Sequence, residues 1–386
     1  MKKTCRILAL LTLAAVLCLG ALSACSCGGE EAKKYKVDFY VDGAVVHSVE
    51  TAGLEKITLP AVPEKDGYKF DGWFLGENEW RNPVESDTYE FAYLKDNVKA
   101  QAKFISLEKT RGLRFDGGKV TGYDGTATEI EIPFYNGSDR VVSVGPMAFM
   151  GNGQIEAVTL SSAVESINVQ AFSGCTKLQS VNFGSRVAFI MASAFSGCTA
   201  LSEVDLPDSL EHLGARAFVG CYNLKKYIYG EGEYVDGWLL GAPYSAKTYA
   251  VKPGTVGIGG EAFRKNDVLT EVTLPDSLKN IGEFAFSGCS ALNKVVLPES
   301  IKYIAGNAFD SCVALTEIII PGGVKIIMPD AFNGCSELKI FANTKTSPSG
   351  WYSGWSQGCK KLYWLTDTSA KNGWHFVDGA PTPWIE

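Results

Sequence analysis

The chain has 386 residues, a formal net charge of −7 at pH 7 and three histidines. An acidic chain without runs of Lys or Arg argues against nucleic acid as a partner, because the phosphate backbone favours basic clusters. The histidines, at positions 47, 212 and 375, are too scattered for a metal-binding motif, and we expect no cofactor. The length allows two or three domains or one repeat array.

The first 24 residues predict a secretory signal peptide. Lys2, Lys3 and Arg6 precede an apolar segment at 7–19, and small residues follow it. The sequence Leu22-Ser23-Ala24-Cys25 resembles a bacterial lipobox. The resemblance implies that Cys25 becomes the lipidated N-terminus and that residues 25–34 form a tether. The protein would then be extracytoplasmic, surface-exposed and anchored to the bacterial cell membrane by its lipid. Ordinary secretion with a coincidental cysteine is the alternative.

Residues 35–104 predict a small, mostly β module. Apolar and polar residues alternate in YKVDFYV and in AVVHSVE, and the Asp42-Gly43 pair between them is a hairpin signal. The module resembles the Listeria–Bacteroides repeat, also called the internalin-type B repeat, which implies a β-grasp-like fold in a bacterial surface protein. Trp73 is then either a ligand-stacking aromatic or the buried anchor of a small core. The residues that carry the resemblance are Tyr35-Lys36-Val37, Phe39, Leu59-Pro60, Gly67-Tyr68, Phe70 and Gly72-Trp73.

Residues 105–338 contain a tandem repeat. An Ala-Phe pair recurs every 23 residues, with one step of 45 residues, and an LxxVxL segment such as LTEVTL accompanies it. A period of roughly 20–29 residues with leucine at fixed offsets is typical of a leucine-rich repeat, whose turns stack because none buries its apolar side alone. The longer step predicts two turns, one of them degenerate. The repeat phenylalanines are Phe149, Phe172, Phe195, Phe218, Phe263, Phe286, Phe309 and Phe332.

One repeat, LTEVTLPDSLKNIGEFAFSGCSA at 269–291, shows the pattern most clearly. It resembles the Treponema-pallidum-type repeat of the Bacteroides surface protein A-like group. With the first module, this resemblance implies a mostly β fold: a β-grasp-like module, then a leucine-rich-repeat solenoid of about ten turns with parallel strands. It also implies adhesion to a protein or glycan ligand, which the sequence does not identify.

The residue three positions after each repeat phenylalanine is Cys or Asn. A nucleophile cannot be exchanged for Asn and still react, whereas a small polar group that bonds loop backbone inside a stacked core can be exchanged. We therefore predict a structural ladder and no catalytic site. Disulfides between neighbouring turns stay open as an alternative, because the rungs are close enough for a bridge. The ladder residues are Asn152, Cys175, Cys198, Cys221, Asn266, Cys289, Cys312 and Cys335.

The third and fifth positions of each LxxVxL segment are predicted to face outward. They form a candidate ligand face with an exposed apolar line made by Ile228, Val296 and Ile319. Repeat proteins bind along such surfaces, and an apolar patch on one suggests a partner. Ordinary β-propensity on a solvated sheet is the alternative. The candidate residues are Glu203, Asp205, Lys226, Ile228, Glu271, Thr273, Lys294, Val296, Glu317 and Ile319.

The C-terminal segment, 339–386, is rich in aromatic residues and holds five of the eight tryptophans. These side chains either stack on a sugar or cap the last turn, and we expect a cap, because the open end of a solenoid exposes apolar residues.

The sequence as a whole predicts a non-enzymatic, adhesin-like surface lipoprotein that binds through its solenoid. An envelope scaffold or spacer without a host ligand is the first alternative. An extracellular hydrolase is the second, and it lacks a G-x-S-x-G elbow, a paired-carboxylate motif and a metal motif.

Overall fold

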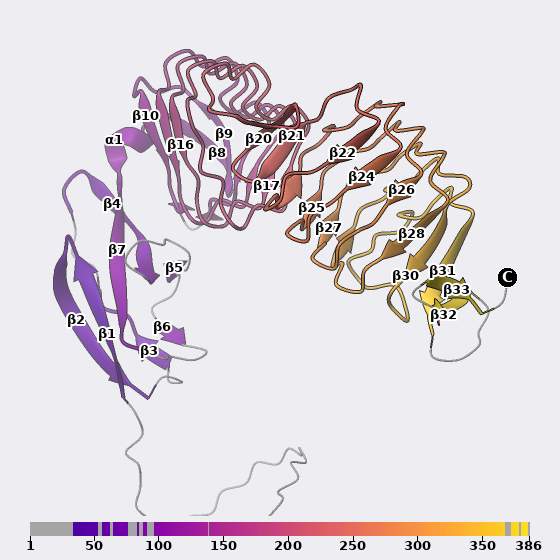
Figure 1. Cartoon of the computed structure of the whole chain (residues 1–386). Helices are drawn as coiled ribbons and strands as arrows, with labels where there is room; N and C mark the ends of the chain where they lie inside the picture. The colour runs from indigo at the N-terminus through magenta and orange to yellow at the C-terminus, as the bar shows by residue number, and fades with distance from the viewer. Residues whose placement is uncertain are drawn as a thin grey trace, which may run out of the picture.

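A computed structural model describes residues 34–52, 56–61, 65–75, 83–84, 88–90, 96–137, 139–366, 372–377 and 380–384. The protein is mostly β, with a small N-terminal sheet followed by a solenoid of about 11 turns with parallel strands. The solenoid forms an arch, and the N-terminal sheet stands at one foot of it (Figure 1). Within the described part of the chain, no helix is long and apolar enough to cross a membrane. The predicted signal peptide and Cys25 lie outside the described residues.

The N-terminal module is a five-stranded sheet with strand order β2-β1-β7-β4-β5, beside a β3–β6 pair. Asp42 and Gly43 both have positive φ and make the two-residue turn that joins β1 to β2. Trp73 is buried, and its ring packs edge-on against Phe39 at 5.0 Å between centroids, so it anchors this small core. The strands are β1 (Tyr35–Val41), β2 (Ala44–Thr51), β3 (Lys56–Thr58), β4 (Tyr68–Leu75), β5 (Pro83–Val84), β6 (Thr88–Glu90) and β7 (Val98–Ser106).

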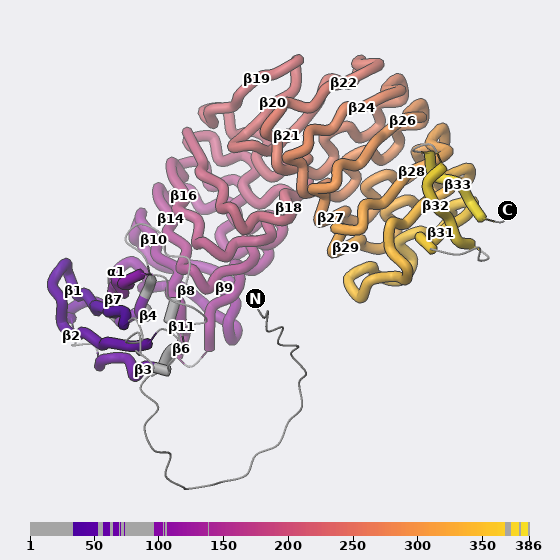
Figure 2. The backbone as a smooth tube through the Cα atoms, turned by 60° about the horizontal axis from the view of Figure 1, so that its bottom comes forward, coloured from indigo at the N-terminus to yellow at the C-terminus, as the bar shows by residue number. Residues whose placement is uncertain are grey.

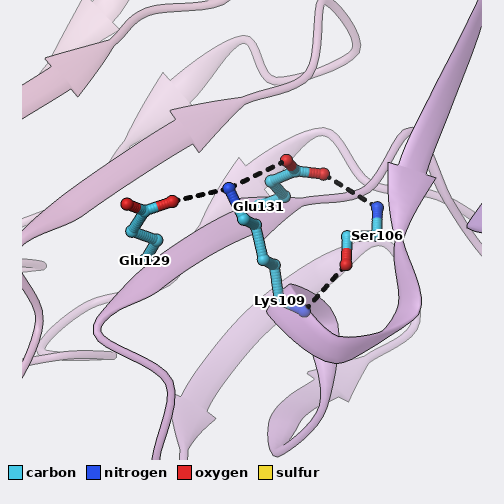
Figure 3. A network of polar contacts seen from close by, with 4 residues as sticks. All are labelled: Ser106, Lys109, Glu129 and Glu131. Atoms are coloured by element: carbon cyan, nitrogen blue, oxygen red, sulfur yellow. Dashed lines mark hydrogen bonds and ion pairs between the residues drawn. The ribbon is translucent and has the colours of Figure 1, made fainter. Parts of the chain in front are cut away.

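A short connection joins the module to the solenoid (Figure 3). Helix α1 (Leu107–Thr110) lies beside β10 (Glu129–Ile132), the first strand of the longer solenoid sheet. The backbone N–H of Ser106 donates to Glu131 at 3.0 Å, and the Lys109 ammonium donates to Glu129 at 2.6 Å. These contacts cover a sheet edge that would otherwise be open to pairing with another chain.

Each complete turn adds one strand to each of two sheets. In the longer sheet the register advances by whole repeats, so that Val158 lies opposite Val181 and both are buried. The sheet runs in three parts, β10-β14-β16, β22-β24-β26 and β28-β30-β31. Its further strands are β14 (Ala157–Leu160), β16 (Ser180–Asn182), β22 (Thr248–Ala250), β24 (Glu271–Thr273), β26 (Lys294–Val295), β28 (Glu317–Ile320), β30 (Lys339–Ala342) and β31 (Lys361–Leu365).

The second sheet consists mostly of two-residue strands. Its first part has the order β18-β17-β15-β13-β9-β8, and its second part continues from β21 through β23, β25 and β27 to β29. A small hairpin of β11 (Tyr135–Asn136) and β12 (Asp139–Arg140) lies beside the first turns. The strands are β8 (Leu113–Asp116), β9 (Lys119–Tyr123), β13 (Ser143–Val144), β15 (Ser166–Ile167), β17 (Phe189–Ile190), β18 (His212–Leu213), β21 (Trp238–Gly241), β23 (Gly257–Ile258), β25 (Asn280–Ile281), β27 (Tyr303–Ile304) and β29 (Ile326–Ile327).

The repeat phenylalanines form the centre of each turn. They stack ring on ring in two separate columns, 149 to 218 and 263 to 332, with neighbouring centroids 4.8 to 5.5 Å apart. The chain reaches each ring through a left-handed residue, as at Gln170 before Phe172 (φ 56°), and leaves it through a second one, as at Gly174 (φ 74°). Two positive-φ corners per turn explain why Gly is frequent after the phenylalanine.

The solenoid is interrupted between the two phenylalanine columns. β19 (Tyr227–Tyr229) turns back and pairs antiparallel with β20 (Gly232–Val235) instead of following β16. The buried residues accordingly form two main clusters, one on each side. The two arms touch again on the shorter-strand side, where the Gly260 N–H donates to Leu213 O at 2.8 Å. The bend of the arch lies here (Figure 2).

The last turns are closed by aromatic side chains. Trp351, Trp355 and Trp374 are buried, and the indole N–H of Trp374 donates to Ala342 O at 2.9 Å. Strand β32 (Gly373–Val377) continues the longer sheet beside β31, and β33 (Ala380–Pro383) adds an antiparallel edge. The tail tryptophans therefore cover apolar side chains of the final turns.

Candidate functional site

The cysteine column lies inside the stacked corner of the turns. Each thiol donates to the carbonyl of the repeat phenylalanine one turn earlier, as from Cys175 Sγ to Phe149 O at 3.1 Å and from Cys312 Sγ to Phe286 O at 3.2 Å. At one Asn position, Asn266, the side-chain oxygen accepts from Leu269 N and the amide donates to Pro243 O. The Cys and Asn side chains at this position thus both form hydrogen bonds with loop backbone.

The cysteines of the described residues are free thiols. Burial raises the pKa of Cys175 and of Cys289 to about 12. A thiol with so high a pKa is protonated at neutral pH and is a weak nucleophile. The described residues also contain no cluster of three or more His, Cys, Asp or Glu that could hold a metal ion. The bonds from these thiols to loop carbonyls give the column the character of a frame.

The outward strand positions are where the sequence pattern puts them in most turns. Thr273 is exposed on β24, and Val296, which directly follows the neighbouring strand β26, keeps 71% of its surface exposed. Glu271 and Lys294 lie opposite each other in β24 and β26 and form an ion pair at 2.7 Å. Glu203 and Asp205 are exposed on a segment before the interruption that is not a regular strand.

The apolar line expected along this face is not continuous. Ile228 lies in the antiparallel hairpin, whose register places it opposite Glu233, and it has left the parallel sheet. Ile319 is half-buried and packs against a cluster formed by Phe341, Tyr363 and Trp374. Val296 therefore stands apart from both, because a hairpin diverts one strand and the aromatic cap covers the other.

The hairpin itself presents a surface that the strand pattern did not predict. Tyr227 and Ile228 on β19 are exposed, the latter by 59%. Tyr222 just before the hairpin and Tyr244 just after β21 are 85% and 72% exposed. Tyrosine supplies a large, rigid and amphipathic contact area, and it is enriched where proteins bind partners. We call Tyr222, Tyr227, Ile228, Tyr229 and Tyr244 the tyrosine surface.

Polar contacts hold this hairpin in place. The Lys252 ammonium sits 3.9 Å from the centroid of the Tyr227 ring. The hydroxyl of Tyr249 donates to Tyr229 O at 2.9 Å and lies 3.1 Å from the hydroxyl of buried Tyr234. A surface whose backbone is fixed before binding loses less entropy when a ligand arrives.

A cleft of about 420 Å³ opens beside the hairpin. The segment around Arg216 and Phe218 lines one side, and Leu240 to Tyr244 line the other. Two ion pairs neutralise most of its charge: Arg216 Nε lies 3.4 Å from Glu261 Oε2, and Lys226 Nζ lies 2.8 Å from Glu233 Oε2. The 45-residue step was the only sequence signal for this site, since it marks where the repeat departs from its period.

Comparison with known families identifies both parts of the chain. The BspA type leucine rich repeat region matches residues 129–234 and 256–349 in six copies. The Listeria-Bacteroides repeat domain matches residues 35–92. Both resemblances expected from the sequence are confirmed. No curated protein matches the chain.

Several solved structures are similar to the chain. The leucine rich repeat protein of T. pallidum is 26% identical to this chain. The alignment covers 57% of this chain and 82% of the T. pallidum protein, with a TM-score of 0.27. A leucine-rich repeat protein from Bacteroides ovatus is 27% identical over 64% of this chain and 66% of its own, with a TM-score of 0.29. The pneumococcal vaccine antigen PcpA is 18% identical over 74% of this chain and 80% of its own, with a TM-score of 0.34.

Proposed function

Since the chain belongs to the BspA type leucine rich repeat family, we propose that it is a non-enzymatic binding protein of the cell surface that holds a protein ligand on its tyrosine surface. The observation that carries the proposal is the exposure of four tyrosines and an isoleucine around the hairpin that interrupts the solenoid. A monomeric protein seldom exposes large side chains together without a use for them. Aromatic anchors also contribute most of the affinity of many interfaces.

The outward positions of the longer sheet are a second part of the proposed surface. Val296 and Thr273 offer a small apolar and hydroxyl patch, and the Glu271–Lys294 ion pair borders it. Such a rim contributes specificity more than affinity, because exposed ion pairs are worth little. We therefore place the anchor of binding at the hairpin and the rim on the sheet.

Binding assays test this function directly. The form comprising residues 28–386 would be tested on extracellular-matrix proteins, epithelial cells and a glycan array. Changing Tyr222, Tyr227 and Tyr229 to Ser should weaken a saturable interaction at least tenfold, whereas Tyr352→Ser, at an exposed tyrosine outside this surface, should not. Val296→Lys tests in the same assays whether the longer sheet is part of the binding surface. If the chain binds none of these targets, an envelope scaffold becomes the better description.

We also propose that Cys25 is lipidated and holds the mature chain on the outside of the cell membrane. The support is the lipobox-like sequence that ends at Cys25 after an apolar segment. Labelling cells with an alkyne fatty acid should tag the natural chain and leave Cys25→Ser untagged. Tagging of the serine variant would refute the assignment.

We propose that the mature chain is divided into a tether (25–34), a B-repeat-like module (35–104), a solenoid (105–338) and a C-terminal cap (339–386), on the support of the repeat patterns and the tryptophan-rich tail. Limited proteolysis is the test: the first cuts should fall near residue 34 and in the connection at 107–112 that follows β7, and they should leave the solenoid and the cap whole. A first cut inside the solenoid would argue against these boundaries.

A further inference from the structure

The corner of each turn is built from a repeating set of backbone hydrogen bonds. In the turn that contains Phe195, the N–H groups of Ser193, Phe195 and Gly197 donate to the carbonyls of the next turn at 2.9, 2.9 and 2.7 Å. The acceptors are Ala215, Ala217 and Val219. Donors and acceptors both lie on every second residue, so each turn offers the next one a row of three alternating donors.

This set is missing at the interruption. The N–H groups of Arg216, Phe218 and Gly220 occupy the same three positions, and none has an acceptor among the hydrogen bonds of the described residues. In the following turn one such bond returns, since Ala242 N donates to Ala262 O at 2.9 Å. The ladder is therefore open on this side of the turn that contains Phe218.

The cleft of about 420 Å³ lies at this opening. Arg216 and Phe218 line it on the donor side, and Gly241 lines it on the other. A backbone N–H removed from water without an acceptor costs free energy, so an occupant that supplies carbonyl oxygens is favoured here. The partner must present them on every second residue, as the next turn does elsewhere.

We propose that this cleft binds an extended segment of a protein ligand, which runs along residues 216–220 and takes the place of the missing turn. Carbonyls of residues i, i+2 and i+4 along one edge of an extended chain have the required alternation and come from a stretch of about five residues. Exposed Val219 and Tyr244, which line the cleft, would contact the ligand side chains. This inference rests on the proposed binding function and adds that the ligand binds through an extended segment.

The charges of the cleft favour a neutral backbone over an anionic polymer. Arg216 and Lys226 are already paired with Glu261 and Glu233, and Glu231 adds a further carboxylate to the lining. An acidic ligand would have to break these pairs. A polypeptide backbone needs only the amide donors, which no side chain occupies.

The test uses the whole mature chain and a phage-displayed library of unstructured 12-residue peptides. Gly241→Phe blocks the cleft, because a side chain at Gly241 meets nothing within 4 Å and projects from its wall. Gly153→Phe is the matched control, since Gly153 is equally unobstructed but lies outside the cleft. Selected peptides should bind natural protein and Gly153→Phe alike and lose at least tenfold in affinity to Gly241→Phe.

Amide hydrogen exchange supplies the second readout. In the free protein, the amides of Arg216, Phe218 and Gly220 should exchange much faster than those of Ser193, Phe195 and Gly197, and a bound peptide should protect them. Equal protection of the two sets in the free monomer would overturn the inference. Protection that rises with protein concentration would also overturn it, because the occupant would then be a second copy.

Failure of the inference can be told apart from failure of the proposed function. Peptides that bind Gly241→Phe as well as the natural chain would place the site elsewhere and leave the binding function standing. If no peptide binds, yet the tyrosine-to-serine changes abolish binding of a whole protein, the cleft is not a peptide site and the tyrosine surface remains one.

Discussion

Phe309 and Phe332 lie one repeat apart and stack with their ring centroids 5.3 Å apart and their planes 4° from parallel. Both rings are fully buried, and each extends the column that begins at Phe263. The rings are parallel because each turn repeats the backbone of the last one, so every phenylalanine leaves its corner in the same direction.

Removing one ring from the column should destabilise the solenoid strongly. We expect Phe309→Ala to lower the free energy of unfolding by about 3–5 kcal/mol, because a buried phenylalanine leaves a cavity that the neighbouring turns cannot fill. Tyr222→Ala, at a side chain that is 85% exposed, should change it by about 0.5 kcal/mol or less. Urea denaturation followed by circular dichroism measures both. Equal effects would show that the column is not a core.

The thiols of Cys175 and Cys289 should be unreactive until the protein unfolds. Burial holds the pKa of both at about 12, so almost no thiolate exists at pH 8. Iodoacetamide at pH 8 should leave their peptides unmodified in native protein and alkylate them completely in urea, as mass spectrometry of a digest would show. Rapid native labelling of Cys175 would contradict the buried position.

Lys265 occupies a corner position that favours glycine. Its φ is 60°, and Gly288, one repeat later, has φ 74°. A left-handed conformation costs a side-chain-bearing residue roughly 1–2 kcal/mol, partly offset by the greater freedom of glycine in the unfolded chain. We expect Lys265→Gly to raise the free energy of unfolding by about 0.5–1 kcal/mol. The reciprocal change, Gly288→Lys, should lower it, and a gain from both would refute the argument.

His212 should make the folded state sensitive to acid. It lies at the inner corner of the arch, 6.1 Å from the Tyr303 ring between centroids, and Glu283 and Asp330 line the same cavity. Burial lowers the pKa of His212 from 6.5 to about 4. Between these values the unfolded chain binds a proton that the folded chain does not. The free energy of unfolding therefore falls as the pH drops through this window, by about 3 kcal/mol in full.

Thermal unfolding at pH 7.5 and pH 4.5 checks this dependence. His212→Phe, which introduces the residue that lies opposite in register at Phe189, should lose part of the acid sensitivity. His47→Gln, at an exposed site in the N-terminal module, serves as the control and should retain all of it. If His212→Phe keeps the full acid sensitivity of unfolding, carboxylates rather than His212 cause it.

The regular turns could be predicted from the sequence, because every turn repeats the same local chemistry: a buried phenylalanine, a left-handed corner and a thiol or amide that bonds the loop. The hairpin could not be predicted in this way. The segment LKKYIY fits the strand pattern as well as its neighbours do. Gly230 and Glu231, however, both adopt positive φ and form a two-residue turn, which reverses the chain and carries Ile228 out of the parallel sheet.

The predicted exposure of Ile319 was wrong for a different reason. Its own strand is regular, and it lies opposite Phe341 in the register of β28 and β30. The side chains that cover it come from the aromatic tail, and contacts between segments so far apart leave no mark in a local pattern. The strand positions that face outward could thus be predicted, whereas the number of these positions that remain exposed could not.

The open ladder at residues 216–220 also sets how the protein responds to stress. A solenoid passes order only between neighbouring turns, and here two neighbours share few backbone bonds across the interruption. The arch therefore behaves as two cooperative blocks with a weak seam. We expect heat, or a force applied between the cell and a bound ligand, to unfold one block while the other stays folded. The weak boundary between the blocks would then limit how far unfolding spreads along the solenoid.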